Sequence, residues 1–400
     1  MSELTAREVA ARLGIKIDTV YAYTSRGVLQ ARREPGSRQS LFDPEDVERL
    51  ARRGRPRRST RPAVLDLVVE TELTTIAEQR IRYRGRDACR MANSHSFEQA
   101  ARWLWNGDDG DFAHPWEAYP ISIPDLPRVR DRIRAAVILS AAGEPFRADL
   151  STGAVASVAE SLIATMVSAV SAEPGVRAAR LVVGKRAPIR GSIAGRLWSR
   201  LSPARPAPGL VGTLNAALVL LADHELAAST LAARIAASVR ADPFSVVLAG
   251  LGPMAGSLHG GASALAHKML ADAVARGPEP ALANALEGHG HLPGFGHLLY
   301  PDGDPRARLL LEMLRDSNGG APVAKAARDL IYAARRHSGT EPNVDFSLAV
   351  LSTAARMPPT AGETIFTIAR TAGWIAHAIE EYAAPPLRFR ARAVSRQALS

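Results

Sequence analysis

The stretch "ETIFTIARTAGWIAHAIEEY" (residues 363–382) shows most clearly what kind of structure the chain forms. Its aliphatic residues recur in alternating steps of three and four, namely Ile365, Ile368, Ala372, Ile375 and Ile379. This spacing places them on one face of an α-helix and predicts that the face is buried. A neighbouring face carries Phe366, Arg370, Gly373 and His377. The stretch therefore predicts a long helix that brings polar groups close to an apolar interior.

The same helical pattern extends over most of the chain from residue 63 onward. Alanine is abundant, aromatic residues make up only 5%, and strict alternation of apolar and polar residues is scarce. The segment "AVASVAESLIATMVSAVSA" (154–172) is apolar nearly all round, which predicts a central helix. One exception, "TELTTIAEQRIRYRGRD" (71–87), is rich in β-branched residues and predicts a small hairpin. The expected fold class is mainly α, with many packed helices.

Length and composition limit the kinds of protein that the chain can form. The 400 residues suit two or three folded units, and 46% hydrophobic residues predict a packed interior. The sequence contains no run of about 18 apolar residues, so we expect no membrane span. The charged start "MSELTAREVA" does not resemble a signal peptide. The single cysteine, Cys89, excludes an internal disulfide and fits a reducing cytoplasmic location.

The first 62 residues carry most of the excess positive charge. They hold 14 Lys and Arg against 8 Asp and Glu, whereas the formal net charge of the whole chain is +10. A local basic excess indicates an anionic partner for this part, with nucleic acid the leading candidate. The alternative is a charged face that meets only solvent.

The segment "LTAREVAARLGIKIDTVYAYTSRGVL" (4–29) predicts two short helices around a turn. Val9 and Leu13 are apolar at helical spacing, Gly14 suits the end of the first helix, and Asp18 can cap the second. A basic second helix of this kind suits insertion into the major groove of DNA.

The following segment, "PGSRQSLFDPEDVERL" (35–50), completes the pattern. Gly36 suits a wing turn, and Pro44 suits the first position of another helix. The order helix, turn, helix, wing, helix resembles the MerR-type and excisionase-like winged helix-turn-helix domains, over about residues 3–53. The resemblance implies DNA contacts from Thr19, Tyr23, Arg26 and Arg38. A small three-helix packing or dimerisation module remains the alternative.

These patterns divide the chain into three parts. We place a winged helix-turn-helix domain at residues 1–53 and a basic linker at residues 54–62. The linker lies in the Pro- and Arg-rich run "RRGRPRRSTRP" (52–62), which can add nonspecific affinity for phosphates. The helical body then occupies residues 63–400.

Two histidines in the body stand in suggestive surroundings. His224 follows an apolar run in "LLADHELAAS" (220–229) and His259 precedes two glycines in "GSLHGG" (256–261). Glycine permits tight turns and close approach of a ligand to the backbone, and a helix that begins near Gly261 favours anions at its N-terminus. Taken alone, His224 is more typical of a hydrogen-bonded core histidine than of a ligand, and His259 is more typical of a turn residue than of a catalyst.

Arg306 and Asp345 stand near predicted helix starts. Asp304 and Pro305 make a suitable cap and first helical residue, so Arg306 falls in the first turn. A cation there opposes the helix dipole, and an anionic partner would resolve the conflict. Asp345 in "EPNVDFSLAVL" precedes an apolar helix, where a carboxylate can serve as a base or as an ordinary cap. An exposed arginine is the alternative for Arg306.

The loop "HGHLPGFGH" (289–297) contains three histidines, His289, His291 and His297. Neither a carboxylate nor a cysteine stands beside them in the sequence, so we expect no metal site. Its glycines match neither a Rossmann nor a P-loop pattern.

Several dispersed motifs in one order together resemble citrate synthase. They are "ADHE" (222–225), "GSLHGGA" (256–262), "PGFGH" (293–297), "DPRAR" (304–308), "PNVDF" (342–346) and "IARTAGWIAHAIEE" (368–381). The resemblance covers roughly residues 64–395. It implies a two-domain all-helical fold, with a small domain at about 261–350 inserted in a large one, that closes over substrate.

The resemblance implies a reaction that belongs to the tricarboxylic acid cycle. Acetyl-CoA, or propionyl-CoA, would condense with oxaloacetate and water to give citrate, or 2-methylcitrate, and CoA, without a permanently bound cofactor. Asp345 would be the base that removes the methyl proton, and His259 the donor to the thioester oxygen. His297 would donate to the oxaloacetate carbonyl as it becomes a hydroxyl.

The resemblance also implies binding residues and a dimer. His224, Arg306 and Arg370 match the oxaloacetate and citrate ligands. In "PLRFRARAV" (386–394), Arg388 matches best the arginine that reaches the partner subunit's site, and Arg390 competes for that role. Backbone groups of Pro293, Gly294, Phe295 and Gly296 would recognise the adenine of CoA.

Two departures from the family pattern affect the surroundings of the site. Ser263 and Ala264 stand where the family usually has Asn and Glu, and residues 298–301 read Leu-Leu-Tyr-Pro in place of Arg-Val-Tyr-Lys. They predict slower turnover or a different preferred acyl-CoA. The alternative function is a DNA-binding transcription regulator whose body senses oxaloacetate, citrate or CoA esters, and in a third interpretation the head only mediates protein contacts.

Overall fold

The computed structural model divides the chain into two compact units, Met1–Glu70 and Thr71–Ser400. The division falls a few residues beyond the expected start of the body at residue 63. The structure describes residues 4–13, 20, 23–24, 29, 31–33, 40–44, 46–47, 68–108, 110, 115–123, 126–171, 180–181, 187–188, 191–205, 207–256, 261–316 and 321–389.

The first unit combines a helix with a small antiparallel sheet of strand order β1-β3-β2. Among the residues that the structure describes, the elements with defined bounds are β1 (Leu4–Thr5), α1 (Ala6–Leu13), β2 (Ala31–Arg33) and β3 (Ser40–Phe42). Pairing of β2 with β3 brackets the segment in which the wing turn was expected, although Gly36 itself lies outside the described residues. A separate apolar cluster that includes Val9, Val20, Leu29 and Phe42 gives this unit its own core.

The second unit begins with the predicted hairpin and continues as helices. β4 (Thr74–Ala77), β5 (Arg80–Tyr83) and β6 (Arg86–Asp87) form an antiparallel sheet. The helices around the centre of the unit are α4 (Ala88–Ser94), α5 (Phe97–Asn106), α6 (Val129–Gly143), α7 (Thr152–Ser168), α8 (Ile193–Leu201), α9 (Pro208–Leu221), α10 (Ala228–Ser238), α11 (Pro243–Met254) and α17 (Ala361–Ala383). Short strands pair β7 (Glu117–Ala118) with β10 (Ala187–Pro188) and β8 (Ile121–Ser122) with β9 (Arg180–Leu181).

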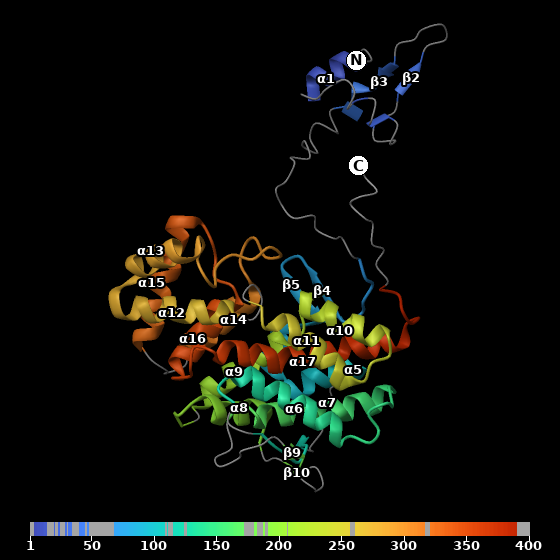
Figure 1. Ribbon diagram of the computed structural model, residues 1–400. Helices are drawn as coiled ribbons and strands as arrows, with labels where there is room; N and C mark the ends of the chain where they lie inside the picture. Colours follow the sequence, from blue (N-terminus) through green and yellow to red (C-terminus); the bar gives the residue numbers. More distant parts are fainter. Residues whose placement is uncertain are drawn as a thin grey trace. The chain divides into compact units, whose positions relative to one another are not determined.

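Five further helices pack together at one side of this unit, in yellow to orange in Figure 1. They are α12 (Ala262–Arg276), α13 (Pro278–His289), α14 (Pro305–Asp316), α15 (Ala321–Ser338) and α16 (Val344–Ala354). α12 contacts α13, α15 and α16, and α14 contacts both α16 and α9. The start of α12 at Ala262 agrees with the helix expected near Gly261. No helix within the described ranges is long and apolar enough to cross a membrane.

α17 runs through the centre of the second unit and packs against α5, α7, α9, α10 and α11 (Figure 1). The predicted buried face is confirmed, since Ile365, Ile368 and Ile375 are fully buried. Arg370 and His377 on the neighbouring face are buried as well, because α9 and α10 cover that side of the helix. α17 therefore carries polar side chains into the interior.

Gly373 explains how closely α9 approaches α17. A Cβ atom at this position would collide with the backbone oxygen of Ala222 and would lie 2.6 Å from Oδ1 of Asp223. Only glycine lets the segment after α9 pass this close to α17. That segment carries His224, so the contact helps to place a predicted binding residue.

Candidate active site

One side of the site is formed by the end of α9 and the middle of α17. Arg370 is 1% exposed, and its Nε donates to the backbone oxygen of Leu221 at 2.9 Å. Its guanidinium lies 4.7 Å from the ring centroid of Phe366. Burial lowers the pKa of Arg370, although the nearby carboxylate of Asp223 opposes that shift. Arg370 is thus a buried cation held by backbone and aromatic contacts.

The segment that carries His224 is fixed by buried hydrogen bonds. The Tyr83 hydroxyl, from β5, lies 3.0 Å from the oxygen of Leu220 and 3.1 Å from that of Asp223. The Asp223 carboxylate accepts from Thr74 Oγ1 at 2.5 Å and from His377 Nε2 at 3.2 Å. Two elements far apart in the sequence therefore hold His224 in place.

The facing side of the site comes from the segment between α13 and α14. The rings of His224 and His297 have centroids 5.3 Å apart, and His297 lies 4.8 Å from the ring of Tyr300. His224 Nε2 and the Tyr300 hydroxyl are hydrogen-bonded at 3.0 Å. Tyr300 is 1% exposed, so it is an internal link between the two sides. The structure thus brings two of the predicted histidines together.

His297 is held in a defined tautomer. The backbone N–H of Leu299 donates to His297 Nδ1 at 3.1 Å, which leaves the proton of a neutral ring on Nε2. Burial, followed by the charge of Arg306, lowers the pKa of His297. Burial, Arg306 and Arg370 lower the pKa of His224 well below its usual value. Both rings are therefore neutral near pH 7.

Arg306 is buried, at 2% exposed, and is paired with the protein's own carboxylate. Its Nε and Nη2 donate to Asp304 at 2.9 and 2.8 Å. Asp304 also accepts from the backbone N–H groups of Arg306 and Val344, each at 3.0 Å. The alternative of an exposed arginine is wrong, and the anion that offsets the unfavourable position at the helix start is Asp304. The same carboxylate joins α14 to α16.

Asp345 is the second residue of α16, and the cap of that helix is Asn343, whose Oδ1 accepts from the Asp345 N–H at 3.0 Å. Asp345 is therefore not the ordinary cap that was the alternative interpretation. Burial raises its pKa to about 6, with Arg306 opposing the rise and Asp304 adding to it. A carboxylate with a pKa near neutrality is suited to accept a proton from a weak carbon acid.

The predicted CoA loop lies against the residues on both sides of Asp345. Gly294 has a φ of +81°, and a Cβ there would lie 2.9 Å from Cβ of Phe346. The N–H of Gly296 donates to the oxygen of Glu341 at 2.8 Å, and the N–H of Asn343 donates to the oxygen of Gly294 at 2.8 Å. These bonds fix the loop and use some of its backbone groups internally. Pro293 and Phe295 in the same loop are buried.

Arg388 lies at the surface end of a buried polar chain. Its Nε and Nη2 donate to Glu381, each at 2.7 Å, and its side chain is 32% exposed. Glu381 also accepts from Arg234, whose Nη1 donates to Nδ1 of His377 at 2.8 Å. Since His377 contacts Asp223, this chain runs from Arg388 to the residue next to His224. Arg390, the competing candidate, lies outside the described residues.

Several predicted site residues are not described by the structure. They are His259 in the body and Thr19, Arg26 and Arg38 in the head. Tyr23 is described, and its side chain is partly buried against the apolar cluster of the first unit. Tyr23 thus has a packing contact in addition to any role at DNA. Among the described residues, no group of three or more His, Cys, Asp and Glu is placed to hold a metal ion.

Sequence reasoning missed Tyr83 and the roles of Asp223 and Tyr300. Asp223 stands inside the "ADHE" motif, so its position beside His224 was a usable signal. Tyr300 was named only because residues 298–301 depart from the family pattern. That departure did not indicate a contact with His224. Of the substituted residues, Ser263 is buried close to Gly362, where its small side chain fits.

Comparison with known proteins gives the family. Residues 66–392 match the family described as citrate synthase, C-terminal domain. The chain belongs to the citrate synthase family. Residues 3–55 match a helix-turn-helix domain, which agrees with the pattern found in the head.

Similar citrate synthases come from bacteria and archaea. The chain is 34% identical to citrate synthase 2 of Bacillus subtilis over 46% of its length, and 35% identical to citrate synthase of Haloferax volcanii over 46%. It spans about half the length of these two relatives, 50% and 49% respectively. Citrate synthase of Mycolicibacterium smegmatis is 28% identical over 81% of the chain and 89% of that relative.

Solved structures show the same fold. A citrate synthase from Thermoplasma acidophilum, in a ternary complex with carboxymethyl coenzyme A and oxaloacetate, has a TM-score of 0.66. It is 24% identical and covers 82% of this chain and 93% of its own. Citrate synthase from Thermotoga maritima has a TM-score of 0.65, is 23% identical and covers 82% and 93%. The mainly helical citrate synthase fold of the body is thus confirmed.

Proposed function

We propose that the body is an acyltransferase of the EC 2.3.3 class that condenses acetyl-CoA or propionyl-CoA with oxaloacetate. The observation that carries the proposal is the fixed tautomer of His297. Its neutral ring presents an Nε2–H donor in a site that also holds a carboxylate, Asp345, with a pKa raised to about 6. A donor and a base of this kind are what enolisation and condensation require.

Each step has a residue suited to it. Asp345 removes a proton from the carbon next to the thioester, and the enolate oxygen accepts a hydrogen bond from His259. The enolate carbon attacks the ketone carbon of oxaloacetate, while His297 gives a proton to the ketone oxygen. Water then cleaves the thioester to give citrate or 2-methylcitrate and free CoA.

Recognition of oxaloacetate depends on buried cations. Arg370 and Arg306 bind carboxylates, with His224 beside them, because the planar guanidinium group can hold a carboxylate through two hydrogen bonds. Backbone groups of residues 293–296 bind the adenine of CoA. Closure of a small domain at about 261–350 over the large domain then excludes water from the enolate.

We further propose a cytoplasmic homodimer acting in the tricarboxylic acid cycle, in which Arg388 reaches the partner subunit's site. The Arg388 side chain is partly exposed, which leaves it accessible to a partner subunit. It would have to exchange its two bonds to Glu381 for a substrate carboxylate.

A thiol-release assay tests the proposed reaction. Purified dimeric protein is given oxaloacetate with acetyl-CoA and, separately, with propionyl-CoA. Release of free CoA thiol that depends on oxaloacetate is expected with at least one of them. Folded dimer that releases no thiol with either would overturn the proposal.

A second candidate function is transcriptional regulation, favoured by the helix-turn-helix match and the basic first 62 residues. In this proposal the head binds DNA through Thr19, Tyr23, Arg26 and Arg38 on a domain of residues 1–53. The body senses oxaloacetate, citrate or CoA esters. DNA binding measured across a salt titration should then change when those ligands are added. Affinity that is independent of salt and ligand would contradict it.

A further inference from the structure

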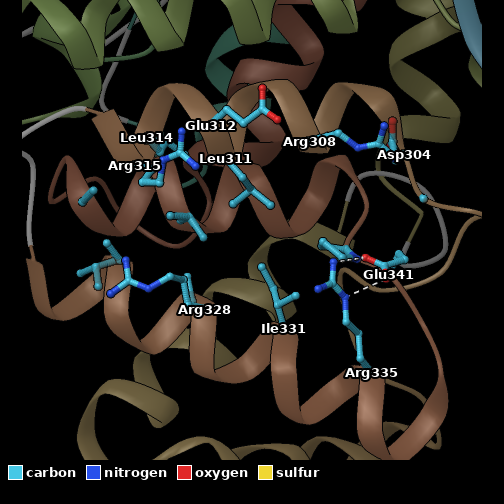
Figure 2. Close-up of a pocket in the computed structure, with 17 residues that line it drawn as sticks. Asp304, Arg308, Leu311, Glu312, Leu314, Arg315, Arg328, Ile331, Arg335 and Glu341 are labelled. Atoms are coloured by element: carbon cyan, nitrogen blue, oxygen red, sulfur yellow. Dashed lines mark hydrogen bonds and ion pairs between the residues drawn. The ribbon is translucent and has the colours of Figure 1, made fainter.

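A cavity of about 270 Å³ lies between α14 and α15, and α16 contributes to its lining (Figure 2). Asp304 and Glu341, which both line it, also hold residues of the candidate active site described above. The volume lies just below the range of pockets that hold drug-sized ligands. The cavity therefore suits a small ligand.

The middle of the cavity is apolar. The aliphatic lining residues are Leu311, Leu314, Val323, Ala324, Ala327, Ile331, Val350 and Ala354. Leu311 of α14 and Ile331 of α15 lie between the two charged ends in Figure 2. A hydrocarbon segment of a ligand is stabilised here by its removal from water.

Four arginines stand at the ends of this apolar segment. Arg308 and Arg315 are seven residues apart on α14, and Arg328 and Arg335 are seven apart on α15. Seven residues of helix span about 10.5 Å. Figure 2 shows Arg315 and Arg328 at one end of the cavity and Arg308 and Arg335 at the other. The cavity thus has two arginines at each end, about two helical turns apart, and Asp304 and Glu341 lie near Arg308 and Arg335.

The carboxylates near the cavity do not pair with all four arginines. Glu341 accepts two hydrogen bonds from Arg335, at 2.7 and 2.8 Å, and Glu312 points away from α15 in Figure 2. Within the described part of the chain, the side chains of Arg308 and Arg328 have no hydrogen-bonded or ion-paired carboxylate. One such guanidinium therefore stands at each end of the apolar segment.

We propose that this cavity binds an aliphatic dicarboxylate with a carboxylate at each end of an unbranched chain. With C–C bonds of about 1.5 Å, an extended chain of roughly six to ten carbons covers the distance between the two ends. Each carboxylate pairs with a guanidinium, and the methylene groups lie against Leu311 and Ile331. Oxaloacetate and citrate are too short to reach both ends and have polar groups where the cavity is apolar.

The position of the cavity connects it to the candidate active site. Asp304 and Glu341 line it. Asp304 also holds Arg306 and the first residue of α16, and Glu341 holds the loop at Gly296. One end of a dicarboxylate in the cavity therefore lies near residues that frame the proposed oxaloacetate site.

Isothermal titration calorimetry on the full chain at constant ionic strength tests the proposal, with suberate, which has eight carbons, as the probe. Saturable binding of suberate is expected, with affinity about tenfold or more above that of succinate, which is too short, and octanoate, which has one carboxylate. Binding should persist when oxaloacetate is saturating. Because catalysis is not measured, this result does not depend on the proposed synthase reaction.

Matched variants locate the site. Arg328→Gln should weaken suberate binding by about tenfold. Arg336→Gln, an exposed neighbour on α15 that does not line the cavity, should leave it unchanged. Ala324→Leu, which fills part of the cavity, should weaken binding without a change of net charge.

Three results would overturn the proposal. They are suberate binding that never saturates, succinate binding as tight as suberate, and equal loss of affinity in Arg328→Gln and Arg336→Gln. Competition between suberate and oxaloacetate would place suberate in the active site and would overturn it as well.

Discussion

Two buried arginines stand in contrasting surroundings on the two sides of the candidate active site. Arg306 donates two side-chain hydrogen bonds to the buried carboxylate of Asp304. Arg370 instead donates to a backbone oxygen and stacks on Phe366. Asp304 neutralises the first cation, whereas the second has no carboxylate within hydrogen-bonding distance among the described residues.

This contrast indicates a division of tasks between the two sides. The side formed by α9 and α17 holds a cation that has no hydrogen-bonded carboxylate among the described residues, which favours binding of an anionic substrate. The side that carries His297, Arg306 and Asp345 holds a donor, a compensated ion pair and a carboxylate with a raised pKa. We therefore expect substitution of Arg370 to cause the larger loss of substrate affinity. Substitutions on the second side should act mainly on turnover or stability, with a smaller loss of affinity at Arg306.

The largest expected effect is on turnover, in Asp345→Asn. The amide cannot accept the methyl proton, so thiol release should fall by about 10²–10⁴-fold, the range typical of a lost general base. Thiol release measured with saturating substrates, together with the thermal unfolding midpoint, checks this prediction. Turnover above one tenth of that of the wild-type protein would assign the base to another residue.

Arg306→Gln should mainly reduce stability. The substitution leaves the Asp304 carboxylate buried without its cation, which typically destabilises a protein by about 3–5 kcal/mol. Urea unfolding measures this change. The double variant Arg306→Gln/Asp304→Asn should recover part of the loss, because the uncompensated charge is gone. A single variant as stable as the wild-type protein would contradict the role given to this ion pair.

Arg370→Gln should mainly reduce oxaloacetate affinity. Loss of one partner from a buried charge pair costs about 2–5 kcal/mol of binding free energy. The unfolding midpoint should change little, because no buried carboxylate loses its hydrogen-bonded partner. Calorimetric titration with oxaloacetate checks the affinity. An affinity loss smaller than that of Arg306→Gln would reverse the proposed division of tasks.

The pH dependence of the reaction tests only the side of the site that carries Asp345. The base works as a carboxylate, and burial raises the pKa of Asp345 from 3.8 to about 6. The value of kcat/KM should therefore fall about tenfold for each pH unit below about 6. Burial lowers the pKa values of His224 and His297, so both histidines lose their protons at lower pH than a free imidazole. A profile that stays flat down to about pH 4 would show that the base has an ordinary pKa.

Tyr300→Phe should give the smallest effect, because it removes one hydrogen bond between the two sides. The lost bond to His224 is worth about 0.5–1.5 kcal/mol, so the KM for oxaloacetate should rise by about two- to tenfold. Tyr332→Phe, at an exposed position on α15, is the matched control and should leave the KM unchanged. Equal behaviour of the two variants would remove Tyr300 from the site.

The sequence predicts features that depend on short spacings better than features that depend on contacts across the fold. The helical face with Ile365 and Ile368 follows from a period of three to four residues, and its burial is confirmed. The motifs also identify Arg306 and Arg370 as candidates. Arg306 is paired with a carboxylate, whereas Arg370 is held by a backbone oxygen. This difference depends on the packing of α14, α16, α9 and α17. Spacing carries no information about such pairings.

The contact of Tyr300 with His224 illustrates the same limit. The two residues are 76 positions apart, and their hydrogen bond forms only because α9 and the segment before α14 meet in the folded body. The chain from Arg388 through Glu381 to Arg234 likewise joins elements that no local pattern connects.

If Arg370 supplies most of the affinity for oxaloacetate and Asp345 only accepts the proton, calorimetric titration of oxaloacetate into the Asp345→Asn protein separates the two roles. We expect an affinity within a few-fold of that of the wild-type protein, although the same protein no longer releases thiol. Loss of oxaloacetate binding together with turnover would contradict this assignment, because Asp345 would then be needed to form the binding site.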